Sequence, residues 1–249
     1  MLWKFPRTSQ VKPELWWKTL NDRYLTWVER LKQSSTTYDE AMSLAVGGSF
    51  DLVGKIEFEI LKYYGLLADH SVADIGCGSG RLAKPLSEYL RGAYLGTDIV
   101  PELVRYGSNL VSRSDWRFVS VDEIAIPASA GEFDFVCFFS VFTHLLHEDT
   151  YTYLQEAKRV LKADGKILFS FLEFSMPGHW PIFEDTLRHR NEGNPLNVFI
   201  NREDVKIWAE HLGLQIVDVH DASAPFSRAV DGADRVDPLG QSVCVLTRA

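Results

Sequence analysis

The sequence of 249 residues has little cysteine and no excess of positive charge. Its three cysteines, Cys77, Cys137 and Cys244, are odd in number and lack CxxC spacing. This argues against a disulfide framework and a zinc site and favours a reducing compartment. The formal net charge is -8, whereas binding to phosphate backbones relies on clustered Lys and Arg. We therefore expect no nucleic-acid partner and no metal.

Long apolar runs are also missing. No segment approaches the roughly 20 apolar residues that span a bilayer, and the N-terminal residues MLWKFPRTSQ contain no apolar stretch of signal-peptide length. We expect a soluble, cytoplasmic protein without a membrane span. Hydrophobic residues make up 46% of the chain, which is ample for the core of one α/β domain with appendages.

The first 65 residues are predicted to form a helical extension. Apolar residues recur at helical spacing from Pro13 to about Gln33 and again from Leu52 to Tyr64. The stretch between them, Ser34 to Ser49, is rich in small polar residues and is predicted to be a loop.

Three tryptophans of the extension, Trp16, Trp17 and Trp27, allow several interpretations. They could belong to a lid that packs on a sugar or another partly apolar acceptor. An aromatic stripe at helical spacing also suits core packing or a homodimer contact through the N-terminus.

Residues 66–249 alternate between short β-rich runs and helical segments. The predicted strands are VADIG, AYLGTD, RFVSV, FDFVCFFS, KILFSFL, LQIVDVHD and QSVCVLTR. The predicted helices are Arg81 to Arg91, Pro101 to Val111, Asp149 to Leu161 and Arg202 to Leu212. Such alternation predicts a doubly wound α/β fold with a mostly parallel seven-stranded sheet. Two long connections, Glu173 to Ile200 and Ala222 to Gly240, are predicted to be insertions on the substrate side.

A glycine-rich turn follows the first predicted strand. Gly76, Gly78 and Gly80 permit positive φ and close approach of a ligand, and the following helix offers free N–H groups. A tight structural turn would have the same pattern. The second predicted strand ends at Asp98, about 20 residues on, where a carboxylate can hold a ribose diol. The third ends before Asp122, which could accept a hydrogen bond from an adenine amino group or cap a helix.

This order of residues resembles the class I S-adenosylmethionine-dependent methyltransferases from about Val72 to Phe171, with further agreement to Arg248. The resemblance implies a last strand antiparallel to the others and S-adenosylmethionine as cofactor. It places Asp74 near the methionine part, Asp98 on the ribose and Asp122 on the adenine side. The residues expected to bind the cofactor are Asp74, Gly76, Cys77, Gly78, Gly80, Asp98, Ile99, Asp122, Glu123, Phe139 and Ser140.

A nicotinamide-dependent oxidoreductase is the main rival, because it shares the fold and the acid after the second strand. A GxGxxG motif started at Gly76 would need its third glycine at Arg81. A Tyr-x-x-x-Lys pair is also missing, since Tyr153 is followed at the fourth position by Ala157. Methyl transfer is therefore favoured.

The acceptor is harder to predict. Methyl transfer from a sulfonium depends mainly on positioning, and a base assists when the acceptor is a hydroxyl. His144 is the first choice for that base and His147 the second, with loop or helix-start roles as alternatives. His179 and Trp180 are candidates for lining the acceptor pocket. Phe139 to Phe142 differs from the Asn/Asp-Pro-Pro-aromatic motif of nucleic-acid N-methylating enzymes.

We therefore expect O-methylation of a small-molecule or sugar hydroxyl. N- or C-methylation of a small molecule and a non-catalytic S-adenosylmethionine-binding module are the alternatives.

Overall fold

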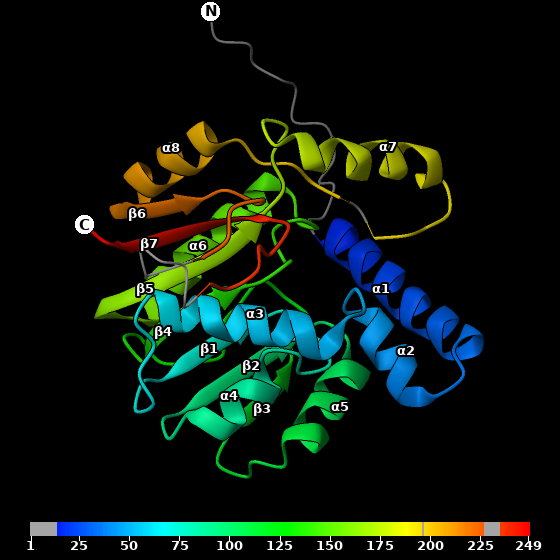
Figure 1. Ribbon diagram of the computed structural model, residues 1–249, viewed down its shortest axis with the longest axis horizontal. Coiled ribbons are helices and arrows are strands. Elements are labelled where there is room, and N and C mark those ends of the chain that lie inside the picture. Colours follow the sequence, from blue (N-terminus) through cyan, green and yellow to red (C-terminus); the bar gives the residue numbers. More distant parts are fainter. Residues whose placement is uncertain (1–13, 196, 227–234) are drawn as a thin grey trace, which may run out of the picture.

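A seven-stranded sheet forms the centre of the protein (Figure 1). The computed structural model describes residues 14–195, 197–226 and 235–249, with side chains from residue 19 onward. The strands are β1 (Val72–Ile75), β2 (Tyr94–Asp98), β3 (Arg117–Ser120), β4 (Phe133–Phe138), β5 (Leu161–Phe171), β6 (Leu214–His220) and β7 (Ser242–Arg248). Each predicted strand is present, and the bounds agree within two residues except that β5 begins at Leu161, five residues before the predicted start at Lys166.

The strand order is β3-β2-β1-β4-β5-β7-β6. All pairs from β3 to β5 are parallel, whereas β7 runs antiparallel to both β5 and β6. The prediction of a doubly wound, mostly parallel sheet with an antiparallel last strand is therefore confirmed. Because β1 lies between β2 and β4 at the point where the order reverses, the carboxyl ends of these strands border the crevice in which such folds bind ligands.

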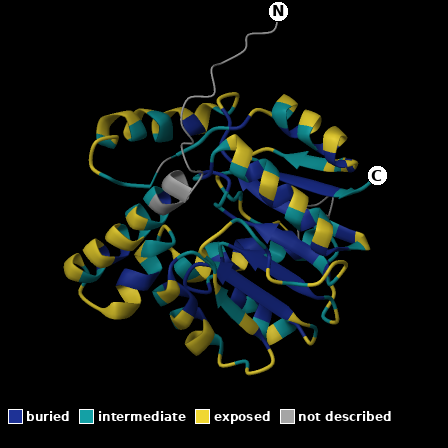
Figure 2. Ribbon diagram, turned by 180° about the vertical axis from the view of Figure 1, so that it is seen from behind, coloured by how far each residue is buried: buried dark blue, intermediate teal, exposed yellow. Residues whose placement is uncertain are grey.

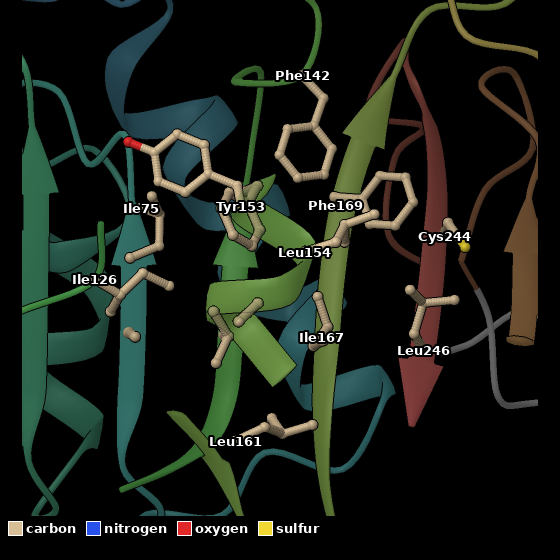
Figure 3. Packing of buried hydrophobic residues seen from close by; sticks show 14 of the residues in the cluster. Ile75, Ile126, Phe142, Tyr153, Leu154, Leu161, Ile167, Phe169, Cys244 and Leu246 are labelled. Carbon is tan, nitrogen blue, oxygen red and sulfur yellow. The ribbon is translucent and has the colours of Figure 1, made fainter. Parts of the chain in front are cut away.

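Helices cover both faces of the sheet. The helices after the extension are α4 (Ala83–Tyr89), α5 (Pro101–Val111), α6 (His147–Val160), α7 (Trp180–His189) and α8 (Arg202–Leu212). One apolar cluster joins the sheet to α6 and α8, and a second joins it to α3 (Phe50–Tyr63) and α4. Figure 3 shows the first cluster, with Tyr153 and Leu154 of α6 beside Ile167 and Phe169 of β5. The five inner strands are accordingly mostly buried, whereas the edge strands β3 and β6 and the outer helix faces are partly exposed (Figure 2).

The N-terminal extension differs from its prediction in one element. The helices α1 (Glu14–Ser34) and α3 are present, but the predicted loop from Ser34 to Ser49 contains α2 (Tyr38–Ala45). The loop prediction was wrong because Thr37 caps α2, accepting a hydrogen bond from the Glu40 N–H at 3.1 Å. Met42 of α2 is buried in a third cluster with residues of α1 and α5. The side chains of Trp16 and Trp17 lie outside the described residues.

The first insertion is also more regular than predicted. Between Glu173 and Ile200 the chain forms a short 3-10 helix, η1 (Pro177–His179), followed by α7. It returns to the sheet where the Ile200 N–H donates to the Leu172 carbonyl at 2.8 Å. In the second insertion, residues 227–234 lie outside the described part, and Phe226 and Val236 form an isolated bridge.

Close backbone contact joins α3 to the glycine-rich turn. A Cβ atom added at Gly54 would lie 2.3 Å from the carbonyl oxygen of Arg81. Only glycine therefore allows α3 to approach the chain that leaves the turn.

We expect Gly54→Ala to lower the free energy of unfolding by about 1–3 kcal/mol in urea denaturation, because overpacking outweighs the gain in helix propensity. Gly178→Ala is the matched control, since its added Cβ would meet nothing within 4 Å. Unchanged or higher stability of Gly54→Ala would contradict this packing.

Candidate active site

A cavity of about 440 Å³ lies at the carboxyl ends of β1, β2 and β4. Its walls come from the glycine-rich turn, α1, the segment Leu44–Gly47, the loop after β4, the residues Asn194 and Pro195 of the first insertion, and Gln241 before β7. Its volume falls within the range of small-molecule and cofactor sites, about 300–1,000 Å³.

The glycine-rich turn is fixed to β2 by backbone hydrogen bonds. The N–H groups of Gly76 and Cys77 both donate to the Thr97 carbonyl, at 2.7 and 2.9 Å. Gly76 has a φ of 73°, and an added Cβ would lie 2.4 Å from Val141. Glycine is required here both for the backbone conformation and for the close packing of the loop after β4.

Asp98 lies at the end of β2 and faces the cavity. One carboxylate oxygen accepts from the Gly78 N–H and the other from the Val100 N–H, both at 2.9 Å. Burial raises the pKa of Asp98, and these N–H groups oppose that rise. The carboxylate therefore connects the glycine-rich turn to the start of α5 and presents an acceptor to the cavity.

Asp74, at the start of the motif, is buried at 3% exposure. Its carboxylate accepts from the Tyr94 hydroxyl at 2.8 Å. Burial raises the pKa of Asp74 to about 7, partly offset by this hydrogen bond. A ligand cation beside Asp74 would favour the ionised form, because opposite charges stabilise each other most in a desolvated site.

The cavity also contains an ion pair that was not predicted from the sequence. Arg81 follows the glycine-rich turn, and its guanidinium binds both carboxylate oxygens of Glu57 from α3, with a shortest distance of 2.5 Å. It also donates to the carbonyl of Val46. In the sequence, Arg81 stands out only as the residue that breaks a dinucleotide motif, and no local motif marks Glu57 within the predicted helix Leu52 to Tyr64.

The loop after β4 is held in an uncommon conformation. Ser140 has a φ of 59° although it is not glycine. Its N–H donates to the Ser170 hydroxyl at 2.7 Å, that hydroxyl donates to Gln241 at 2.7 Å, and the Gln241 amide donates to the Ser140 hydroxyl at 3.0 Å. The network connects β4, β5 and β7 at the cavity wall. Gln241 was not predicted, because no local pattern marks it.

His144 lies in the same loop and lines the cavity. The ring of Tyr24, from α1, contacts it edge-on with a centroid distance of 5.7 Å. Tyr24 also lines the cavity and was not predicted as a site residue.

The structure brings most of the predicted site residues together. The predicted residues that line the cavity are Asp74, Gly76, Cys77, Gly78, Asp98, Ile99, Phe139, Ser140 and His144. Gly80 instead packs against Gly107 of α5. Asp122 and Glu123 are exposed and outside the lining, to which their neighbour Val121 belongs.

The other candidate histidines lie outside the lining. His147 is exposed, contacts Trp208 edge-on, and has Nε2 3.2 Å from the Phe199 carbonyl. His179 is buried, accepts from the Glu173 N–H at 2.9 Å and has Nε2 3.2 Å from the Gly240 carbonyl. Trp180 is half exposed and donates to Glu184. His179 thus joins backbone segments of the two insertions.

Within residues 14–195, 197–226 and 235–249, no helix is both long and apolar enough to cross a membrane. Over the same ranges, no group of three or more His, Cys, Asp or Glu side chains is arranged to hold a metal ion.

Comparison with known proteins agrees with this geometry. Residues 73–169 match the family described as "Methyltransferase domain". A curated relative, the mitochondrial ubiquinone biosynthesis O-methyltransferase of Bos taurus, is 30% identical over 111 residues, which cover 42% of this chain and 29% of that protein. The match thus spans less than a third of the relative's length.

Solved structures share the fold over nearly the whole chain. Magnesium protoporphyrin IX methyltransferase from Synechocystis with bound S-adenosylhomocysteine superposes with a TM-score of 0.63 at 15% identity, covering 96% of this chain and 100% of that one. A TehB-like methyltransferase from Corynebacterium glutamicum gives 0.56 at 18% identity, covering 92% and 99%.

Residues 73–169 are thus similar to the methyltransferase-domain family, and the chain as a whole has the fold of solved methyltransferases, as predicted. In the Synechocystis enzyme this fold holds S-adenosylmethionine.

We expect the affinity for S-adenosylhomocysteine to increase as the pH rises from 6 to 8, because Asp74, with a pKa of about 7, must ionise to pair with the ligand's ammonium group. The stability of the ligand-free protein depends on pH in the opposite direction. Because the pKa of Asp74 is higher in the folded than in the unfolded protein, the free energy of unfolding falls as the pH rises from about 4 to 7.

Asp74→Asn should therefore weaken binding at pH 8, yet raise the unfolding free energy of the free protein by an amount on the order of a few kcal/mol. Calorimetric titration and urea denaturation at pH 5 and 8 measure both effects. A pH-independent affinity in the wild type would contradict the assignment.

Proposed function

We propose that the protein transfers a methyl group from S-adenosylmethionine to a hydroxyl group of a small molecule or sugar. The observation that carries the proposal is one cavity that joins the glycine-rich turn and Asp98 to His144. The O-methyltransferase that is similar over 111 residues supports a hydroxyl acceptor.

The charged side chains that line the cavity fit this cofactor. Its carboxylates are Glu57, Asp74 and Asp98, and the cofactor has two cationic groups, a sulfonium and an ammonium, in addition to one carboxylate. Asp98 lies at the end of the second strand, where such folds hold a ribose diol. When bound, S-adenosylmethionine supplies an activated methyl group that a nucleophile can take by in-line displacement.

Side chains of the protein orient the acceptor and accept its proton. In this proposal His144, which contacts Tyr24, accepts the hydroxyl proton as oxygen forms its bond to the methyl carbon. Leu20, Tyr24 and Trp27 of α1 line the cavity, so the N-terminal extension serves as a cover that excludes water and packs against the acceptor.

Asp98→Ala should lower the affinity for S-adenosylhomocysteine by about 10-fold or more, because two ribose hydroxyls lose a charged hydrogen-bond partner. Calorimetric titration provides the measurement, and Asp164→Ala, an exposed acid outside the cavity lining, is the control. Unchanged affinity in Asp98→Ala would contradict the assignment of Asp98 as the residue that binds the ribose hydroxyls.

The acceptor is identified by a screen of phenols, catechols, sugars and small amines that detects S-adenosylhomocysteine formation. With a hydroxyl acceptor, His144→Ala should reduce kcat by about 10²- to 10⁴-fold and leave the cofactor affinity unchanged. His147→Ala, at an exposed ring outside the lining, should retain nearly full activity. Full activity of His144→Ala would exclude His144 as the base, and turnover with amines alone would overturn O-methylation.

A further inference from the structure

Arg81 is the one arginine or lysine among the described residues that line the cavity. Three carboxylates, those of Glu57, Asp74 and Asp98, line it as well. A ligand with two cationic groups and one carboxylate therefore meets a complementary set of charges. Within the described residues, its carboxylate has a single cationic side chain to pair with.

The hydrogen bonds of Arg81 leave part of its guanidinium available. An arginine has five N–H donors. Nε and Nη2 each donate to Glu57, and Nη1 donates to the Val46 carbonyl. Among the described contacts, one N–H therefore remains on each of Nη1 and Nη2. Two donors on neighbouring nitrogens of one planar group match the two oxygens of a carboxylate.

The N-terminal extension holds this guanidinium in place. Glu57 of α3 is 1% exposed, and the side chain of Arg81 is 11% exposed. Val46 belongs to the segment after α2 that also lines the cavity, and the Ser79 hydroxyl next to the turn donates to the Met42 carbonyl of α2 at 2.8 Å. Because both partners of Arg81 come from the extension, its orientation is fixed before a ligand enters.

We propose that Arg81, oriented by Glu57 and Val46, binds the carboxylate at the amino-acid end of the cofactor, so that the N-terminal extension makes the site selective for ligands with that carboxylate. The proposal rests on the proposed function, because it takes S-adenosylmethionine as the ligand. Glu57 is a positioning residue in this arrangement, since it acts through Arg81.

A thermodynamic cycle between one side chain and one ligand group tests the proposal. The two probes are S-adenosylhomocysteine and S-adenosyl-3-thiopropylamine, which retains the nucleoside, the sulfur and the amine and lacks only the carboxylate. Calorimetric titration gives the Kd of each probe for the wild type, Arg81→Gln, Arg81→Lys and Glu57→Gln.

We expect Arg81→Gln to weaken the binding of S-adenosylhomocysteine by about 10- to 100-fold, as for other charged hydrogen bonds. The binding of the amine probe should weaken by less than about 3-fold. Arg81→Lys should fall between wild type and Arg81→Gln, because it retains the charge but loses the paired donors. Glu57→Gln should show a smaller loss that is again confined to the carboxylate-containing probe.

Equal weakening of both probes would overturn the proposal, since Arg81 would then only shape the site. Unchanged Kd values would overturn it as well. If Arg81→Gln does not fold, as judged by circular dichroism, the same comparison in Arg81→Lys and Glu57→Gln decides. A wild type that binds neither probe would instead refute the proposed function itself.

Discussion

The site depends on the hydrogen bonds between the glycine-rich turn and the end of β2. Gly76 and Cys77 donate to the Thr97 carbonyl, and the Gly78 N–H donates to the Asp98 carboxylate. These bonds satisfy backbone groups that would otherwise be left without partners as the chain passes from β1 toward α4. They also place the Asp98 carboxylate and the turn, both of which line the cavity, at the same edge of the sheet, where such folds bind their ligands.

The N-terminal extension is joined to this turn by side-chain and backbone contacts. Ser79 bonds to Met42 of α2, Arg81 bonds to Glu57 of α3, and Gly54 allows the two backbones to touch. The energetic consequence is that the buried Glu57 carboxylate needs Arg81, because an unpaired charge in this desolvated position would be strongly destabilising. The extension therefore supplies part of the cavity wall and the partners that hold Arg81.

Much of the fold could be predicted from the sequence. Largely apolar runs such as Phe133 to Phe138, in which Asp134 is the one polar residue, mark strands buried on both faces. The spacing from Gly78 to Asp98 reflects one strand-helix-strand unit. The failures have local causes. The helix α2 is only 8 residues long, and its Thr37 cap lies within a polar stretch that has the composition of a loop.

The site residues that were not predicted were missed for a different reason, which is that they lie far along the chain from the residues that they contact in the site. Tyr24, Glu57 and Gln241 reach the cavity from elements whose sequence patterns indicate only a core-facing helix or a strand start. Their roles arise from tertiary contacts, such as that of Gln241 with Ser140, 101 residues away. By contrast, Asp98 and the glycines follow strand ends directly, and a local motif is enough to find them.

A crystal structure of the protein with S-adenosylhomocysteine would test the assignment of the cavity to the cofactor. We expect the ribose hydroxyls within hydrogen-bond distance of the Asp98 carboxylate, the amino-acid end between Asp74 and Arg81, and the sulfur facing the loop that carries Ser140 and His144. A ligand bound outside this cavity, or one whose ribose is turned away from Asp98, would contradict it.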